Sequence, residues 1–223
     1  MDWEGAPSQK TRLAPQLEPL AEGGFVPHRV LVLLGVLTAA AILVSAGFAA
    51  NVKIRVEGKN FTIHGSTQPT VKGVANPLEA LDMASFAGEF YYLVTTSSFG
   101  DYVSQIGKYA GDQSSGWVFK VNGVSPPVGA RDVALKDGDV VLWYYATFGP
   151  TGGPPTLDLQ RLPGNCYRVA AVNDAGKASV AAGAVLYVDG RNFKAPNGRA
   201  CVGKHVGTVR ATLSGTVRSN AVK

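Results

Sequence analysis

Apolar and polar residues alternate along two stretches of the chain in the manner of β-strands. In Val52–Val56 and again in Trp117–Val121, apolar residues occupy every second position, the period that places one set of side chains on each face of a sheet. Val140–Ala146 is apolar at every position, so this strand is either central and covered on both faces or carries a ligand or partner on its second face. Asn122-Gly123 and the Asp-Gly-Asp run at 137–139 supply turns between these strands.

One helix is expected within this first group of strands. Asn76 is a suitable N-cap, Pro77 fits the first helical position, and Gly88 ends the pattern. Further strands are predicted at 61–64, 90–94 and 99–106. The apolar helix residues expected to share the face packed on the sheet are Leu78, Leu81, Met83, Ala84 and Phe86.

A second group of short extended runs follows a Gly- and Pro-rich segment that we assign as a linker at 150–156. Turn residues separate these runs at intervals typical of a β-sandwich. The predicted strands are Leu157–Leu162, Cys166–Val172, Ala184–Val188, Arg199–Val202, Gly207–Leu213 and Thr216–Ser219.

Residues 1–50 contain a hydrophobic segment that predicts export. Residues 1–29 are polar and without periodicity, and we expect them to be disordered. Val30–Ala50 then runs for 21 residues without a charge. At 1.5 Å per residue this is roughly 31 Å of helix, enough to cross the hydrocarbon core of a bilayer. A cleaved signal peptide and an uncleaved membrane anchor both fit, and either places the rest of the chain outside the cytoplasm.

The motifs of the first group resemble a known family. GWVFKVNG and VGARDVALKDGDVVLWYY, preceded by NPLEALD and FGDYVSQIG, are similar to bacterial transcobalamin-like C-terminal domains. The resemblance spans about 51–149. It implies a β-grasp fold and, as ligand, a corrinoid such as cobalamin or another flat amphipathic molecule, with no cofactor required. The helical-barrel domain that grips most of the cobalamin in vitamin B12 carriers has no counterpart in this chain.

The second group carries a weaker resemblance. AGAVLYVDGRNFKAPNGRACV followed by GTVRATLSGTVRSN looks like a bacterial immunoglobulin-like repeat, which implies a β-sandwich over 157–223. The predicted fold class is therefore α+β and mainly β. It consists of a β-grasp domain and an immunoglobulin-like sandwich, preceded by a hydrophobic signal or anchor helix.

Aromatic residues gather in the predicted β-grasp domain. A single helix covers one face of its sheet, so the second face needs a ligand, the neighbouring domain or a partner protein. If the sandwich domain packs over that face, ligand binding there loses most of its support. The residues we expect to contact a ligand are Trp117, Phe119, Trp143 and Tyr145, with Phe99 and Tyr102 at the rim.

Positive charge is concentrated in the second group of strands. Residues 51–150 have a net charge of −1 and residues 151–223 a net charge of +7. The alternative function is therefore a structural or adhesive envelope protein whose basic domain contacts anionic cell-wall polymer or a protein partner. No nucleic-acid partner is expected. The candidate basic patch consists of Arg191, Lys194, Arg199 and Lys204.

The two cysteines, Cys166 and Cys201, predict one disulfide, because an exported chain with an even cysteine count usually pairs them. No nucleophile–base or metal-ligand motif is present, and the aspartates around Gly138 fit turns better than a Ca²⁺ site. We expect a secreted or surface-anchored binding protein without catalytic activity and without a bound metal.

Overall fold

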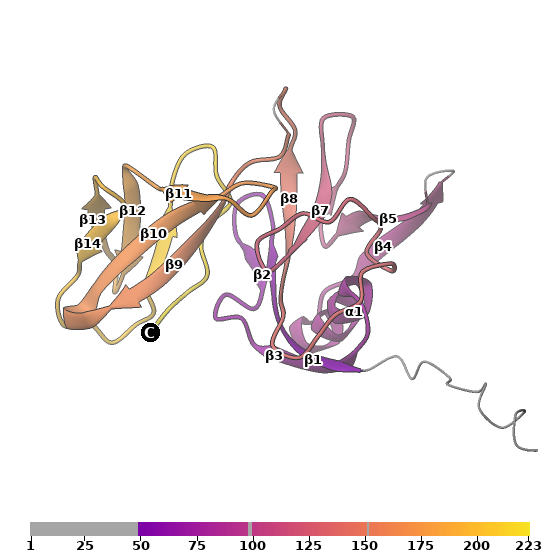
Figure 1. The fold of residues 1–223 in the computed structure, drawn as a ribbon, viewed down its shortest axis with the longest axis horizontal. Coiled ribbons are helices and arrows are strands. Elements are labelled where there is room, and N and C mark those ends of the chain that lie inside the picture. The colour runs from indigo at the N-terminus through magenta and orange to yellow at the C-terminus, as the bar shows by residue number, and fades with distance from the viewer. Residues whose placement is uncertain (1–48, 98–99, 151) are drawn as a thin grey trace, which may run out of the picture. The chain divides into compact units, whose positions relative to one another are not determined.

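The computed structural model describes residues 49–97, 100–150 and 152–223, which form four β-sheets and one α-helix (Figure 1). The expectation of a mainly β fold is confirmed. Residues 30–48 of the predicted signal or anchor segment lie outside the described residues. The last residue of that segment, Ala50, is the first residue of a strand. Among the described residues, no helix is long and apolar enough to cross a membrane.

The largest sheet has five strands. Its main path runs β2-β1-β8-β7, and β3 also pairs with β1. β1 and β8 are parallel neighbours, whereas the other pairs are antiparallel. The sequence pattern did not identify β3. The strands are β1 (Ala50–Glu57), β2 (Thr62–His64), β3 (Thr70–Val74), β7 (Ser115–Val121) and β8 (Val140–Thr147).

The predicted helix, α1 (Pro77–Gly88), packs on one face of this sheet. The Asn76 side chain accepts hydrogen bonds from the main-chain N–H groups of Leu78 and Glu79, as expected of an N-cap. The expected apolar face was wrong at Met83 and Phe86, whose exposed fractions are 43% and 74%. These two residues follow Glu79 by four and seven positions, so they lie on its side of the helix. The buried helix residues are Pro77, Leu78, Ala80, Leu81 and Ala84.

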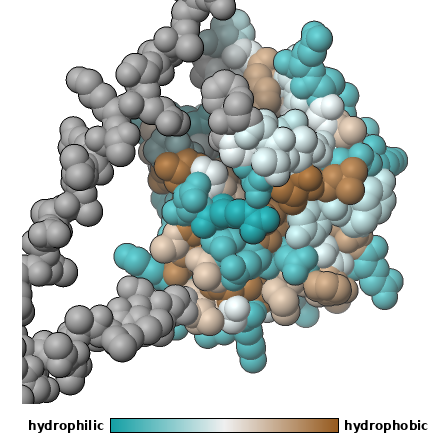
Figure 2. Space-filling model, turned by 90° about the vertical axis from the view of Figure 1, so that its right-hand side faces the viewer, coloured by the Kyte–Doolittle hydropathy of each residue, from teal (hydrophilic) through white to brown (hydrophobic). Residues whose placement is uncertain are grey.

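A second, smaller sheet has the order β4-β5-β6 and lies beside the first (Figure 1). Its strands are β4 (Tyr92–Ser97), β5 (Gly100–Ile106) and β6 (Tyr109–Ala110). β4 begins two residues later than predicted and is mostly exposed, including Leu93 and Val94. Figure 2 looks onto the side that carries α1, β4 and β5, where hydrophobic side chains lie at the surface among hydrophilic ones.

Residues 156–212 contribute two further sheets that share one hydrophobic core. In one sheet β10 pairs with β9, β11 and β14, and in the other β12 pairs with β13 and β15. The sequence pattern did not identify β11 and β13. Thr216–Ser219 is no strand, although Val217 bridges to Thr156. The strands are β9 (Thr156–Leu162), β10 (Cys166–Val172), β11 (Ala178–Val180), β12 (Ala184–Val188), β13 (Arg191–Ala195), β14 (Arg199–Cys201) and β15 (Arg210–Thr212), and the 3₁₀ turn η1 (Pro163–Asn165) joins β9 to β10.

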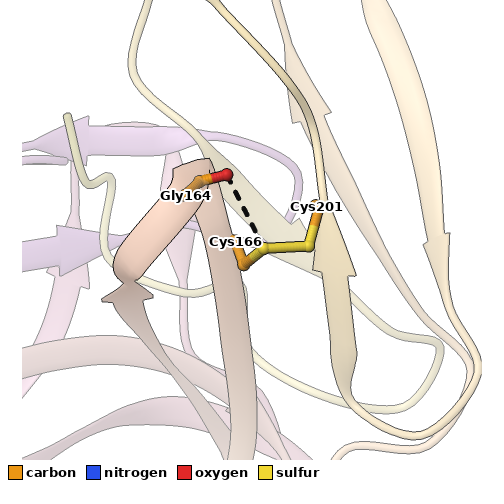
Figure 3. The surroundings of a disulfide bond; sticks show 3 residues. All are labelled: Gly164, Cys166 and Cys201. Carbon is orange, nitrogen blue, oxygen red and sulfur yellow. Dashed lines mark hydrogen bonds between the residues drawn. A yellow bond between two sulfur atoms is a disulfide. The ribbon is translucent and has the colours of Figure 1, made fainter.

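The predicted disulfide is confirmed. Cys166 and Cys201 lie directly opposite each other on β10 and β14, and their sulfurs are bonded (Figure 3). The Cys166 sulfur also lies 3.7 Å from the carbonyl oxygen of Gly164. A disulfide sulfur has no hydrogen to donate, so we treat this approach as a van der Waals contact. The bridge joins two cysteines that are 35 residues apart in the chain.

Candidate ligand-binding cavity

Four of the predicted ligand contacts lie on the face of the large sheet that packs on α1. Alternation along β7 and β8 directs Trp117 and Phe119 to the same face as Trp143 and Tyr145. The rings of Phe119 and Trp143 have centroids 5.1 Å apart, and those of Trp117 and Tyr145 are 5.6 Å apart. The Trp143 indole N–H donates to the carbonyl oxygen of Pro77 at the start of α1, over 3.0 Å. These rings therefore belong to the core between sheet and helix.

The exposed fractions of these side chains differ widely. Trp117 and Trp143 are 7% and 2% exposed, whereas Phe119 and Tyr145 are partly buried. Tyr102, on β5, is 52% exposed and fits the predicted place at a rim. Phe99 lies outside the described residues. The pattern of alternation placed the rings on one face but could not show how deeply each is buried.

The opposite face of the sheet is covered by the C-terminal part of the chain. Leu142, Tyr144 and Ala146 are buried in a cluster with Val217. A main-chain hydrogen bond also joins the two parts of the chain: the N–H of Ser125 donates to the carbonyl oxygen of Asp174 over 2.8 Å. The face that we expected to be open is therefore closed, and a ligand lying flat on it loses its support.

Lys120, on this covered face, binds residues 172–174 of the C-terminal part of the chain. Its side chain is fully buried, and its ammonium group donates to the carbonyl oxygens of Val172 and Asn173, each over 3.0 Å. The same nitrogen lies 3.3 Å from the Asp174 carboxylate. Burial lowers the pKa of Lys120, while Asp174 opposes that shift. A buried ammonium needs such partners, and all of them come from the segment after the Gly/Pro linker.

A second charged cluster on this face surrounds the Glu57 carboxylate, which is fully buried. Arg55, Arg210 and Arg218 approach it at 3.2, 2.7 and 2.9 Å, and Thr62 donates a hydrogen bond to it. Arg210 also donates to the Thr62 hydroxyl. Burial lowers the pKa of Arg55 to about 10, although Glu57 favours its charged form. We name this group the Glu57 cluster.

A cavity of about 310 Å³ lies beside β7. Its wall includes Trp117, Phe119 and Trp143, and Tyr102 of β5 stands on its other side. Residues 125–126 and 128–131, in the loop after β7, also line it. Four of the six predicted ligand contacts thus meet at one cavity. Tyr145 lines a different depression with Lys59 and Arg218.

Polar groups stand at separate points of this largely apolar cavity. One is Asp174, whose carboxylate accepts hydrogen bonds from Ser125 and Tyr144 over 3.2 and 3.5 Å. Burial and the nearby carboxylate raise the pKa of Tyr144. The other is the ion pair of Asp101 with Arg131, 2.8 Å long. Hydrogen bonds from Thr96 and Arg131 lower the pKa of Asp101.

This arrangement suits binding. It combines aromatic walls, a few placed hydrogen-bond partners and a concave shape, as small-molecule sites do. The sequence patterns singled out the aromatic residues but gave no sign of Asp174 or of its hydrogen bond with Tyr144, because no local signal joins residues 30 positions apart across a linker. Among the residues that the structure describes, no group of three or more His, Cys, Asp or Glu side chains lies close enough to hold a metal ion.

The predicted basic patch is divided between two sheets. Arg191 and Lys194 lie on β13, whereas Arg199 lies on β14 of the other sheet, and Lys204 is exposed in a loop. The register instead places Arg199 directly opposite Arg168 on β10. The sequence reasoning missed Arg168, because the pairing of β10 with β14 is not visible in local spacing.

Comparison with known proteins shows a similarity to one described family over part of the chain. Residues 79–147 match the family described as "Domain of unknown function (DUF4430)". This stretch holds most of α1, the small sheet, β7 and β8, and with them most of the cavity wall. No curated protein sequence matches the chain.

One solved structure with some similarity is a "putative metal binding protein" from Ruminococcus gnavus ATCC 29149. It has a TM-score of 0.33 and 11% sequence identity, and the alignment covers 45% of this chain and 99% of that one. Similarity at this level supports no conclusion about either fold or metal binding. The transcobalamin-like identity expected from the sequence is not shown by these comparisons.

Proposed function

We propose that residues 50–147 form a β-grasp module that binds a small, partly apolar ligand in the cavity beside β7. The observation that carries this proposal is the meeting of Trp117, Phe119, Trp143 and Tyr102 at one concave site. The helix held against a mixed sheet with parallel central strands supports the β-grasp assignment. The protein has a binding rather than a catalytic role in this proposal.

The volume of the cavity limits what the ligand is. About 310 Å³ is at the small end of the range for ligand sites, roughly 300–1,000 Å³. A corrinoid such as cobalamin would insert only one edge of its macrocycle, whereas a smaller amphipathic molecule would fit as a whole. The resemblance to transcobalamin-like domains supports testing corrinoids first.

A location outside the cytoplasm, either secreted or anchored at the membrane surface, completes this proposal. The disulfide between Cys166 and Cys201 is consistent with it, because disulfides persist in oxidising compartments.

The proposal includes an immunoglobulin-like sandwich as the second domain. The two sheets of residues 156–212, which share one core, support this assignment.

Tryptophan fluorescence tests ligand binding directly, since two of the three tryptophans of the chain line the cavity. The full chain is titrated with cobalamin, cobinamide and haem. We expect a saturable change with at least one of them. If none gives a saturable change up to about 1 mM, which marks very weak affinity, binding of this ligand class is contradicted.

Contact with anionic cell-wall polymer is a second candidate function, favoured by the pairing of Arg168 with Arg199. Like charges directly opposite each other destabilise a sheet unless an anion lies between them. The two side chains border a groove of about 450 Å³ on the sheet that contains β10. We expect binding to a polyanion to weaken steeply between 0.1 and 1 M salt, as the screening length falls from roughly 10 to 3 Å. Binding that is independent of salt, or equal in an Arg168→Gln/Arg199→Gln variant, would argue against this contact.

A further inference from the structure

β7 is the last strand of its sheet, and one side of its main chain is left unpaired. The N–H of Asn122 donates to Val140, and the N–H of Phe148 donates to Ser114. Even-numbered residues of β7 therefore direct their main-chain groups toward β8. Consecutive strand residues direct these groups to opposite sides, so Trp117 and Phe119 direct theirs away from β8. Within the described residues, no hydrogen bond reaches the main-chain groups of these two residues from that side.

This free edge has defined ends. At one end, Val121 exchanges main-chain hydrogen bonds of 2.9 and 3.0 Å with Val124. At the other end, the N–H of Asp112 donates to the carbonyl oxygen of Ser115 over 2.7 Å. The unpaired stretch is therefore 117–119. An added strand of three residues would match it, with a length of about 10 Å at 3.3–3.4 Å per residue.

The cavity lies along this edge. Trp117, Val118 and Phe119 all line it, although alternation points Val118 to the opposite face of the sheet from the two aromatic rings. A space reached from both faces must lie beside the strand. Tyr102 and Val103 of β5 stand across the cavity, and Figure 1 shows β5 next to β7. Unpaired strand edges of this kind accept an extended peptide as an additional strand.

We propose that the ligand of this cavity is an extended peptide segment that pairs with the edge of β7 at 117–119. The proposal rests on the ligand site proposed above and assigns the chemical class of its occupant. In antiparallel pairing, side chains opposite each other share a face. The two outer residues of the segment therefore face the rings of Trp117 and Phe119, and they are apolar.

The middle residue of the segment meets different chemistry. It lies opposite Val118, on the face of Tyr144 and Asp174. The Asp174 carboxylate is 42% exposed. Lys120, Ser125 and Tyr144 all contact its Oδ1. Its Oδ2 accepts from the N–H of Gly153 over 3.3 Å and can accept from a further donor. A middle side chain that donates hydrogen bonds, such as lysine, complements this oxygen, whereas glutamate offers only acceptors. The recognised pattern is thus apolar–basic–apolar in an extended conformation.

Blocked peptides with a valine-lysine-valine core test this assignment on the full-length protein, with the two tryptophans of the cavity as fluorescence probe. The key comparison is a peptide with the same side chains whose two valine amides are N-methylated. This change removes the N–H groups that would donate to the carbonyl oxygens of Trp117 and Phe119. We expect the unmodified peptide to bind saturably and the N-methylated peptide to bind at least about tenfold more weakly. A peptide with glutamate in the middle should also bind more weakly.

The outcomes separate the two proposals. Equal affinity of the unmodified and N-methylated peptides would overturn pairing with β7 while leaving the cavity as a ligand site. If cobinamide or haem binds and no peptide does, the peptide proposal is likewise overturned while the cavity remains a ligand site. If neither peptides nor small molecules bind, the ligand site and its peptide occupant are both wrong.

Discussion

Replacing Glu57 by alanine is expected to lower the free energy of unfolding by about 3–5 kcal/mol, the range seen when one partner of a buried ion pair is removed. The carboxylate is fully buried and is shared by Arg55, Arg210 and Arg218. Most of this loss is expected to come from Arg55, because its side chain is only 4% exposed and water cannot replace the carboxylate as its partner. The measurement is chemical denaturation of the full chain.

Two further variants define the cause of this loss. Asp132→Asn removes a carboxylate that is exposed, so we expect a change within about 0.5 kcal/mol. The double variant Arg55→Met/Glu57→Met removes both the buried cation and its partner, and it should recover part of the stability lost in Glu57→Ala. A loss below about 1 kcal/mol in Glu57→Ala is the behaviour of an exposed ion pair. That result would contradict the covering of this sheet face by residues 210–219.

The disulfide is the second feature whose removal should have a large effect. A Cys166→Ala/Cys201→Ala variant is expected to lose roughly 3–4 kcal/mol, the loop-closure value for a bridge between residues 35 apart. The small core between the two C-terminal sheets offers little to offset this loss. Denaturation of the oxidised and reduced wild-type protein should show the same difference.

Peptide mapping without reduction provides the control for this prediction. Fragments that contain Cys166 and Cys201 should remain linked until a reductant is added. Free thiols in protein prepared under oxidising conditions would contradict the bridge. Equal stability of the oxidised and reduced forms would show instead that the bridge forms without stabilising the fold.

Local chemistry was sufficient to predict the elements with strong signals. The N-cap and first position of α1, the turn at Asn122-Gly123 and the start of β8 all follow from local residue types. Both turn residues have positive φ angles, 50° and 83°, as a tight turn of this kind requires. β3, β11 and β13 carry weaker signals, with glycine, serine or charged residues in short runs. Their pairing is decided by neighbouring strands rather than by propensity.

The polar positions of the large sheet show where alternation fails. In β1, Arg55 and Glu57 occupy positions that alternate with the apolar residues, yet both are buried. On β7, Lys120 is likewise fully buried. Arg55 and Glu57 pair with each other, but their further partners, Arg218 and Arg210, lie more than 150 positions away in the chain. The carbonyl oxygens that bind Lys120 lie more than 50 positions away. Local periodicity carries no information about such partners, so the covered face could not be predicted.

The candidate site was predictable in its residue types but not in its position. The cluster of aromatics indicated a site near β7 and β8, and four of the six chosen residues line the cavity. The ligand was expected on an open sheet face, whereas the cavity lies beside the edge of β7. β7 has a free edge because it is the last strand in the order β2-β1-β8-β7. This order depends on the parallel pairing of β1 with the far side of β8, and local sequence gives no sign of that pairing.

Binding in the cavity beside β7 is tested most directly by the indole N–H resonances of Trp117 and Trp143 in the full chain. These groups donate to the carbonyl oxygens of Tyr109 and Pro77, so each indole should give a distinct signal. We expect both signals to shift and saturate together during titration with the tightest-binding ligand. Val128→Phe, which enlarges a half-exposed side chain in the cavity wall, should weaken binding at least about tenfold.

Val206→Phe is the matched control, because Val206 is 84% exposed and lies outside the cavity wall. It should leave both the shifts and the affinity unchanged. Saturable binding that moves neither indole signal, or an affinity for Val128→Phe equal to that of the wild type, would contradict a ligand site beside β7.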